Sequence, residues 1–285
     1  MLMPVQLPDV HPADLTEKLS SFQKKGKAIL ATNFYNYETL RGILQAAAVL
    51  EQPIILQLTK SSLDYMGLAS AVKMARAGLQ SFNIKGWLHL DHCYSYSLIQ
   101  QCLDAGFDSV MIDASERPLE DNIRITRKVV DLALQYNANV EAELGYVAKL
   151  GQSTDQVGFT DPEEARQFVE ATGVHALAVA IGSAHGFYKQ EPRLDIELLA
   201  TIREKTGIPL VLHGGSGIPA AALQQAIKNG ISKINLATEI KNIFIQTLQA
   251  CLTENEEIDL RVVFPPAINA VSDLVKEKLA IINQP

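Results

Sequence analysis

The sequence predicts a (β/α)8 TIM barrel, in which eight parallel strands form a closed ring surrounded by helices. Short apolar runs rich in β-branched residues occur eight times along the chain, and a longer stretch with helical periodicity follows each of them. Strands that are apolar on both faces and separated by helices are typical of parallel βα units, and eight such units match a closed barrel. A doubly wound open sheet is the alternative, because the order of the strands cannot be read from the sequence. The length of 285 residues favours a single domain over 1–285.

The eight predicted strands are short and mostly aliphatic. In chain order they cover 28–33, 54–58, 87–90, 109–112, 139–144, 176–181, 209–212 and 233–236. The N-terminal stretch up to about Lys25 and the C-terminal residues 266–282 have helical patterns and no place in the repeat. We therefore expect one additional helix at each end of the chain, flanking the barrel.

Two of the intervening helices carry clear sequence signals. Residues 160–173 (TDPEEARQFVEATG) offer Thr160 or Asp161 as the N-cap, a proline in the first turn, early acidic residues and a closing glycine. Residues 119–137 show a helical period, which predicts that one face packs on the barrel. That face would carry Ile123, Val129, Val130 and Leu134.

The composition restricts the partners and the compartment. The net charge of −7 disfavours nucleic acid and anionic membranes as partners. No segment approaches the ~20 apolar residues of a membrane span, and the N-terminus lacks a signal-peptide pattern. The cysteines, Cys93, Cys102 and Cys251, form no CxxC pair or disulfide framework, which suits a reducing compartment. We therefore expect a soluble, cytoplasmic protein that acts on a small molecule.

Three of the six histidines lie at the ends of predicted strands. His92 follows the third strand, His185 the sixth and His213 the seventh. Active groups of such barrels come from the carboxyl ends of the strands, so the three imidazoles should meet at the barrel mouth. A lone histidine is more often an ordinary core or surface residue. Three nitrogen ligands with one open position are typical of catalytic Zn²⁺, and the set therefore predicts a metal site.

The stretch HLDHC (89–93) divides into separate predicted roles. His89 and Asp91 share one face of the third strand, whereas His92 is expected to begin the following loop. His89 lies deeper and is predicted to make a structural hydrogen bond, and Cys93 is predicted to pack. Asp91 is adjacent to a candidate ligand, where a carboxylate can act as a catalytic acid or base. Its alternative role is to orient a histidine.

Glycine-rich segments after the last two strands indicate a phosphate site. HGGSGIP (213–219) follows the seventh strand and INLATE (234–239) follows the eighth. Loops at these two places, opening onto helix N-termini, form the usual phosphate site of the barrel. The predicted contacts come from glycine backbone and from polar side chains: Gly214, Gly215, Gly217, Ser216, Asn235 and Thr238.

Carboxylates complete the predicted mouth. Asp113 ends the fourth strand, and Glu141 and Glu143 alternate onto one face of the fifth. Inward-facing acids near a cation favour a role at the metal or in bracing its ligands. For Glu141, simple pairing inside the barrel is the alternative.

Seven segments, spread from about Asn33 to the C-terminus, carry a resemblance to a known family. They are HLDHC, GFDSVMIDAS, NVEAELG, TDPEEARQFVEATG, LAVAIGSAHGFY, IPLVLHGGSGIP and KINLATEI. Together they resemble the zinc-dependent class II ketose-bisphosphate aldolases, and the INLATEI form looks most like the tagatose- and fructose-bisphosphate branch. The resemblance implies a TIM barrel with Asp91 as the acid/base and Zn²⁺ bound by His92, His185 and His213.

The resemblance also implies the remaining site residues. Glu143 and Asp113 match acidic positions near the metal, where they serve as alternative ligands or brace the histidines. Asn33 and Gln57 match positions that line the mouth. Arg261 matches a basic position that could meet a distal phosphate, within or across subunits, with a surface ion pair as its alternative. The dihydroxyacetone-phosphate half, often with a bound Na⁺ or K⁺, is implied to contact Gly186, Gly214, Ser216, Asn235 and Thr238.

The reaction implied by the resemblance is reversible cleavage of a fructose- or tagatose-1,6-bisphosphate type ketose into dihydroxyacetone phosphate and an aldehyde. Asp91 takes the C4 hydroxyl proton, the C3–C4 bond breaks, and zinc stabilises the enediolate. In the family, a glutamate in a glycine-rich loop after the fifth strand protonates the carbanion. Here that loop reads YVAKLGQSTDQVGFTDP. It contains no such glutamate, and Asp155 is either the substitute or a solvated loop residue.

Other functions remain open at this level. An aldolase for another phosphorylated keto-sugar or keto-acid fits the altered loop. A non-catalytic sugar-phosphate binder is a second possibility, which Asp91 and the three histidines argue against. A metal-dependent hydrolase is disfavoured, because no HxH pair occurs at the first strand. We also expect a homodimer or homotetramer.

Overall fold

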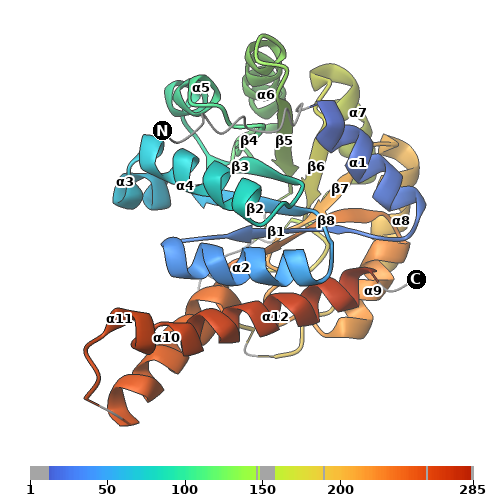
Figure 1. Cartoon of the computed structure of the whole chain (residues 1–285). Helices are drawn as coiled ribbons and strands as arrows, with labels where there is room; N and C mark the ends of the chain where they lie inside the picture. Colours follow the sequence, from blue (N-terminus) through green and yellow to red (C-terminus); the bar gives the residue numbers. More distant parts are fainter. Residues whose placement is uncertain (1–12, 146, 148–157, 189, 255, 284–285) are drawn as a thin grey trace.

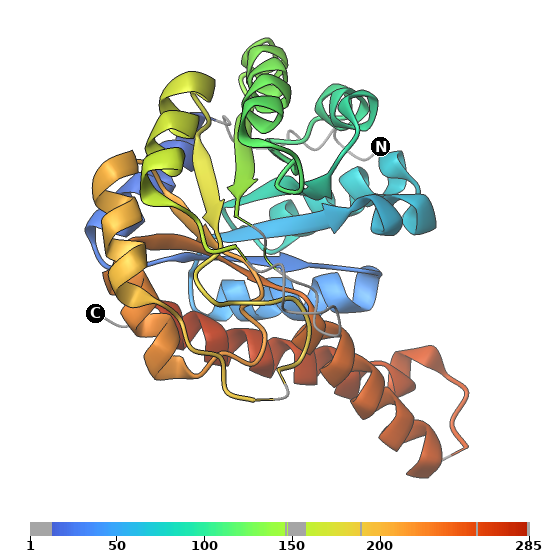
Figure 2. The same ribbon diagram turned by 180° about the vertical axis from the view of Figure 1, so that it is seen from behind.

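The computed structural model describes residues 13–145, 147, 158–188, 190–254 and 256–283. Eight parallel strands form a closed barrel in sequence order, and β1 pairs with both β2 and β8. Helices surround the strand ring (Figures 1 and 2), so the (β/α)8 prediction is confirmed and the open sheet is excluded. The strands are β1 Ile29–Asn33, β2 Ile54–Thr59, β3 Gly86–Cys93, β4 Ser109–Ile112, β5 Asn139–Leu144, β6 Ala176–Val179, β7 Leu210–Leu212 and β8 Ile231–Leu236.

The helices begin and end where local chemistry dictates. The Asp161 side chain caps α7 by accepting hydrogen bonds from the backbone N–H groups of Glu163 and Glu164, and Gly173 ends the helix in the left-handed region at φ 67°. Leu134 is 64% exposed at the end of α6, so its predicted place on the packed face is wrong. The helices are α1 Ala13–Lys24, α2 Tyr37–Val49, α3 Lys60–Met66, α4 Leu68–Ser81, α5 Tyr96–Asp104, α6 Leu119–Leu134, α7 Pro162–Thr172, α8 Ile196–Thr206, α9 Ala220–Lys228, α10 Thr238–Glu254, α11 Leu260–Val263 and α12 Pro265–Asn283.

The two flanking helices are present, and they have different positions. Helix α12 packs along α2 on the outside of the barrel (Figure 1). Helix α1 covers the amino ends of the strands, where Leu15, Leu19 and Phe22 pack with Trp87 and other strand residues in a small core of their own. Because α1 closes this end, the carboxyl ends of the strands form the accessible mouth.

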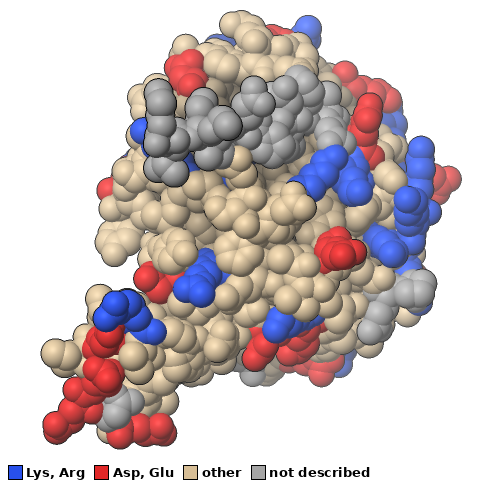
Figure 3. Space-filling model, in the orientation of Figure 1, with Lys and Arg blue, Asp and Glu red and all other residues tan. Residues whose placement is uncertain are grey.

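The second half of α10 and the short α11 project away from the barrel (Figures 1 and 2). This arm exposes the apolar side chains of Leu252, Ile258, Leu260 and Val262. On the face shown in Figure 3, basic and acidic side chains are interspersed over the surface. Among the described residues, no helix combines the length and apolar character that a bilayer crossing requires.

The contact between α2 and α12 depends on a glycine. A Cβ at Gly42 would lie 2.7 Å from the carbonyl oxygen of Ile268 and 2.8 Å from Cβ of Val271. The Ile268 carbonyl belongs to the backbone and cannot rotate away from a new side chain. Overpacking in Gly42→Val should therefore lower the free energy of unfolding by about 3 kcal/mol. Denaturant unfolding measures the effect, and Arg41→Val, at the preceding and exposed position of α2, is the control. Equal stability of the two variants would contradict the close packing of these helices.

Candidate metal centre and active site

Three imidazoles meet at the barrel mouth, although they come from distant parts of the chain. His92 lies on β3, His185 follows β6, and His213 directly follows β7. Each offers a ring nitrogen, and the three nitrogens lie within 4.8 Å of one another. Nδ1 of His213 is 2.9 Å from Nε2 of His92. The three histidines therefore converge in the structure, as the sequence predicts.

Strand β3 places Asp91 and His92 at the mouth in a way that alternation alone does not predict. The strand continues to Cys93, and its register with β4 shifts between Leu90 and Cys93. His92 takes a left-handed backbone conformation at φ 43°, which is uncommon for a non-glycine residue and costs of order 1 kcal/mol. The expectation that His92 begins the loop is therefore wrong. An irregularity inside the strand lets both residues line the mouth.

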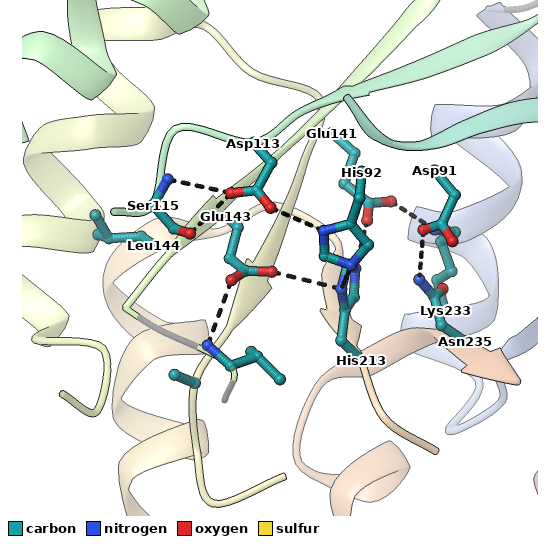
Figure 4. Close-up of polar contacts among 12 residues, drawn as sticks. Asp91, His92, Asp113, Ser115, Glu141, Glu143, Leu144, His213, Lys233 and Asn235 are labelled. Atoms are coloured by element: carbon teal, nitrogen blue, oxygen red, sulfur yellow. Dashed lines mark hydrogen bonds and ion pairs between the residues drawn. The ribbon is translucent and has the colours of Figure 1, made fainter. Parts of the chain in front are cut away.

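Asp113 and Glu143 form a second group with His92. Oδ2 of Asp113 lies 2.8 Å from Nδ1 of His92, and burial raises the pKa of Glu143 to about 8. Oε2 of Glu143 is buried without a hydrogen-bond partner, 3.4 Å from Nδ1 of His213 (Figure 4). His92, Asp113 and Glu143 bring ligand atoms within 4.8 Å of one another. A buried oxygen with no hydrogen-bond partner, beside converging nitrogens, fits a bound cation.

Beneath the imidazoles, the barrel interior contains an ion pair. Oε1 of Glu141 lies 2.9 Å from Nε2 of His213, and Oε2 of Glu141 accepts a 2.7 Å hydrogen bond from Nζ of Lys233. The sequence analysis assigned no role to Lys233. Lys233 and Asn235 are two residues apart on β8, so both face the inside of the barrel. Nδ1 of His89 is 2.8 Å from Oγ of Ser109, so its predicted structural hydrogen bond is confirmed.

Asp91 is held by two asparagine side chains. Nδ2 of Asn33 donates to Oδ2 of Asp91 at 3.1 Å, and Nδ2 of Asn235 lies 3.5 Å from Oδ1. Burial alone would raise the pKa of Asp91, but His92, His213 and Lys233 outweigh it and lower that pKa below its usual value. The carboxylate is therefore ionised and fixed in direction at the wall of the mouth.

A cavity of about 700 Å³ opens at this mouth. Among the residues predicted from sequence, its wall includes Asn33, Asp91, His92, His185, Gly186, Gly214, Ser216, Asn235 and Thr238. Sequence reasoning missed further lining residues, among them Tyr35, Lys60, Tyr94 and Lys241. Their spacing carries no motif, since they come from loops and from helix N-terminal turns.

The other predicted residues lie outside the cavity wall or outside the described residues. Gln57 is fully buried below the mouth, and Gly215 donates its backbone N–H to the carbonyl of Asn235. Arg261 lies on the projecting arm, where its side chain is 90% exposed and pairs with Asp259 at 2.7 Å. A role for Arg261 across subunits stays a prediction. Asp155 lies outside the described residues.

The glycine-rich loop after β7 is built for a close backbone approach. Gly214 has φ 67°, and a Cβ there would lie 2.2 Å from the carbonyl oxygen of Ala184. The hydroxyl of Tyr188 accepts from Ala184 N–H and donates to the Gly214 carbonyl. Tyr188 thereby joins the loop that carries His185 to the glycine-rich loop. Sequence reasoning assigned no role to this tyrosine.

Comparison with known proteins agrees with this architecture. The sequence model of the class-II fructose-bisphosphate aldolases matches residues 13–284. The YdjI aldolase from Escherichia coli K12 is 33% identical, with a TM-score of 0.84 over 95% of this chain and 97% of that one. A Coccidioides immitis protein is 28% identical over 96% of each chain, with a TM-score of 0.85. The fructose-bisphosphate aldolase from Campylobacter jejuni shares the fold at 20% identity, with a TM-score of 0.82 over 96% of this chain and 95% of that one. The chain therefore belongs to the class-II fructose-bisphosphate aldolase family and is an aldolase, a lyase that breaks a carbon–carbon bond.

Proposed function

We propose that this aldolase depends on zinc and reversibly cleaves a ketose phosphate, of the fructose- or tagatose-1,6-bisphosphate type, into dihydroxyacetone phosphate and an aldehyde. The observation that carries the proposal is the meeting of His92, His185 and His213 beside Asp91 in the wall of one cavity. Three imidazole nitrogen donors with an open side match the ligand set of catalytic Zn²⁺. When bound, the metal supplies a Lewis acid for the substrate carbonyl oxygen.

The chain's own residues perform the proton transfer and the positioning. Asp91 is the acid/base: its carboxylate takes the proton of the C4 hydroxyl in cleavage and returns it in synthesis. Asn33 and Asn235 orient that carboxylate through their side-chain amides. The low pKa of Asp91 keeps it ionised and ready to accept a proton.

The phosphate half of the substrate is assigned to the glycine-rich loop and the start of α10. Ser216 and Thr238 line the cavity there with Gly186 and Gly214. Lys241 lies one turn into α10 on the same wall, and helix N-termini favour anions. A monovalent cation, Na⁺ or K⁺, is proposed beside this phosphate by family resemblance alone.

A glycine substitution tests this loop. In Gly214→Ala the new Cβ clashes with the Ala184 backbone at a left-handed position. Strain of about 1–3 kcal/mol in this loop should raise KM for the ketose phosphate by about 5–150-fold. Gly173→Ala has the same φ of 67° and no atom within 4 Å, and it should leave KM unchanged. Steady-state kinetics separates the two. An equal KM in both variants would remove this loop from substrate binding.

The proposed activity is tested with purified protein and a panel of ketose phosphates and phosphorylated keto-acids, with and without a chelator. Cleavage that releases dihydroxyacetone phosphate, stops with the chelator and returns with Zn²⁺ supports the proposal. Turnover that persists after complete metal removal would refute the zinc dependence. Turnover of a panel member other than the 1,6-bisphosphates would replace the proposed substrate.

A further inference from the structure

Lys233 and Glu141 form an ion pair inside the barrel, and neither side chain lines the cavity. Nζ of Lys233 lies 2.7 Å from Oε2 of Glu141, and the two side chains are 2% and 3% exposed. Burying two charges costs several kcal/mol per ion, and apolar residues often stabilise such a position as well or better. The pair therefore requires a reason other than stability.

The second oxygen of Glu141 points to such a reason. Oε1 accepts from Nε2 of His213 at 2.9 Å, which leaves Nδ1 of that ring facing Nε2 of His92 at 2.9 Å. His92 is held in the opposite sense, because its Nδ1 contacts Asp113 (Figure 4). The two imidazoles are thus fixed through opposite nitrogens and present the remaining nitrogens to each other.

We propose that Glu141 is a positioning residue for His213, and that Lys233 holds Glu141 in place from the opposite side. Glu141 selects the His213 tautomer with hydrogen on Nε2 and a free lone pair on Nδ1. This inference rests on the proposed zinc site. Carboxylates that brace a ligand histidine contribute about 10–100-fold to metal affinity.

Lys233 also connects to the acid/base. With its amide oxygen turned toward Lys233, Gln57 accepts from Nζ of Lys233 and from Nδ2 of Asn235, both at 3.2 Å. Asn235 in turn reaches Asp91. Loss of activity in a Lys233 variant would therefore not show which end of this connection failed. Zinc affinity reports on the His213 end alone, because Asp91 belongs to neither candidate ligand group among the described residues.

The experiment compares Glu141→Leu, which has no hydrogen-bond acceptor for Nε2 of His213, with Lys233→Met, the double variant and the wild-type protein. Each single variant leaves a buried charge without its partner, so it should unfold at a lower temperature. The double variant removes both charges and should recover most of that stability. Its affinity for Zn²⁺, measured by competition with a chromophoric chelator, should nevertheless stay about 10–100-fold weaker than wild type.

A second, partly buried ion pair provides the control. Arg76 and Asp108 lie 2.7 Å apart, with side chains 18% and 6% exposed, and neither residue lines the cavity. The double variant Arg76→Met/Asp108→Asn should keep wild-type zinc affinity. An equal loss of affinity there would attribute the effect to general destabilisation and overturn the proposal.

A measurement on the wild-type protein covers the case in which the variants fail to fold. Imidazole ¹⁵N shifts of the zinc-loaded protein report the tautomer of His213, with its signal assigned through its loss in His213→Asn. We expect hydrogen on Nε2 for His213 and on Nδ1 for His92. Hydrogen on Nδ1 of His213, or a double variant with wild-type zinc affinity, would overturn the proposal. A wild-type protein that binds no zinc would instead refute the proposed function.

Discussion

Replacement of Asp91 by alanine should lower kcat for carbon–carbon cleavage by about 10²–10⁴-fold, the usual contribution of a general acid or base. The carboxylate is 6% exposed, lines the cavity beside His92 and is oriented by Asn33 and Asn235. Zinc content should stay close to wild type, because Asp91 belongs to neither candidate ligand group among the described residues. Steady-state kinetics and elemental analysis of the same preparation measure both quantities.

Two further variants sharpen the interpretation of that result. Asp91→Asn keeps the shape of the side chain but cannot accept the proton, and it should lose activity to a similar degree. Asp121→Ala removes an exposed carboxylate that pairs with Arg124 on α6, and it should retain full activity. If Asp91→Ala loses its zinc together with its activity, Asp91 braces the metal site and another group moves the proton.

Replacement of His185 by alanine should reduce bound zinc from about one ion per chain to almost none, with loss of activity in parallel. His185 is partly exposed at the mouth, so its removal disturbs the barrel interior less than removal of the fully buried His213. The measurement is elemental analysis after dialysis against a weak chelator, with circular dichroism as the check on folding.

The two candidate ligand groups make this variant decisive. His175→Ala is the control, since Nδ1 of His175 accepts from the Val140 backbone at 3.0 Å and the residue belongs to neither ligand group. Full zinc content in His185→Ala would place the ion in the group formed by His92, Asp113 and Glu143. The three-histidine site would then be wrong, although the aldolase family would stand.

The sequence predicted the barrel because its signals are local. Each strand is a short aliphatic run, and caps such as Asp161 and Gly173 act within one helical turn of their own residues. The candidate site followed from the same information, since residues at the carboxyl ends of parallel strands must meet at one mouth. Local signals thus located His92, His185 and His213 without any knowledge of their mutual distances.

The distances and directions came only from the tertiary structure. The irregularity in β3 depends on its register with β4, which pairing between strands decides. The contact of Glu141 with His213 joins residues 72 positions apart, and that of Glu141 with Lys233 joins residues 92 positions apart. The position of Arg261 depends on the direction of the projecting arm formed by α10 and α11, and helix packing determines that direction. The sequence by itself determined which groups reach the mouth. The closure of the barrel decided which nitrogens His92 and His213 present to each other, because that orientation depends on partners brought together only by folding.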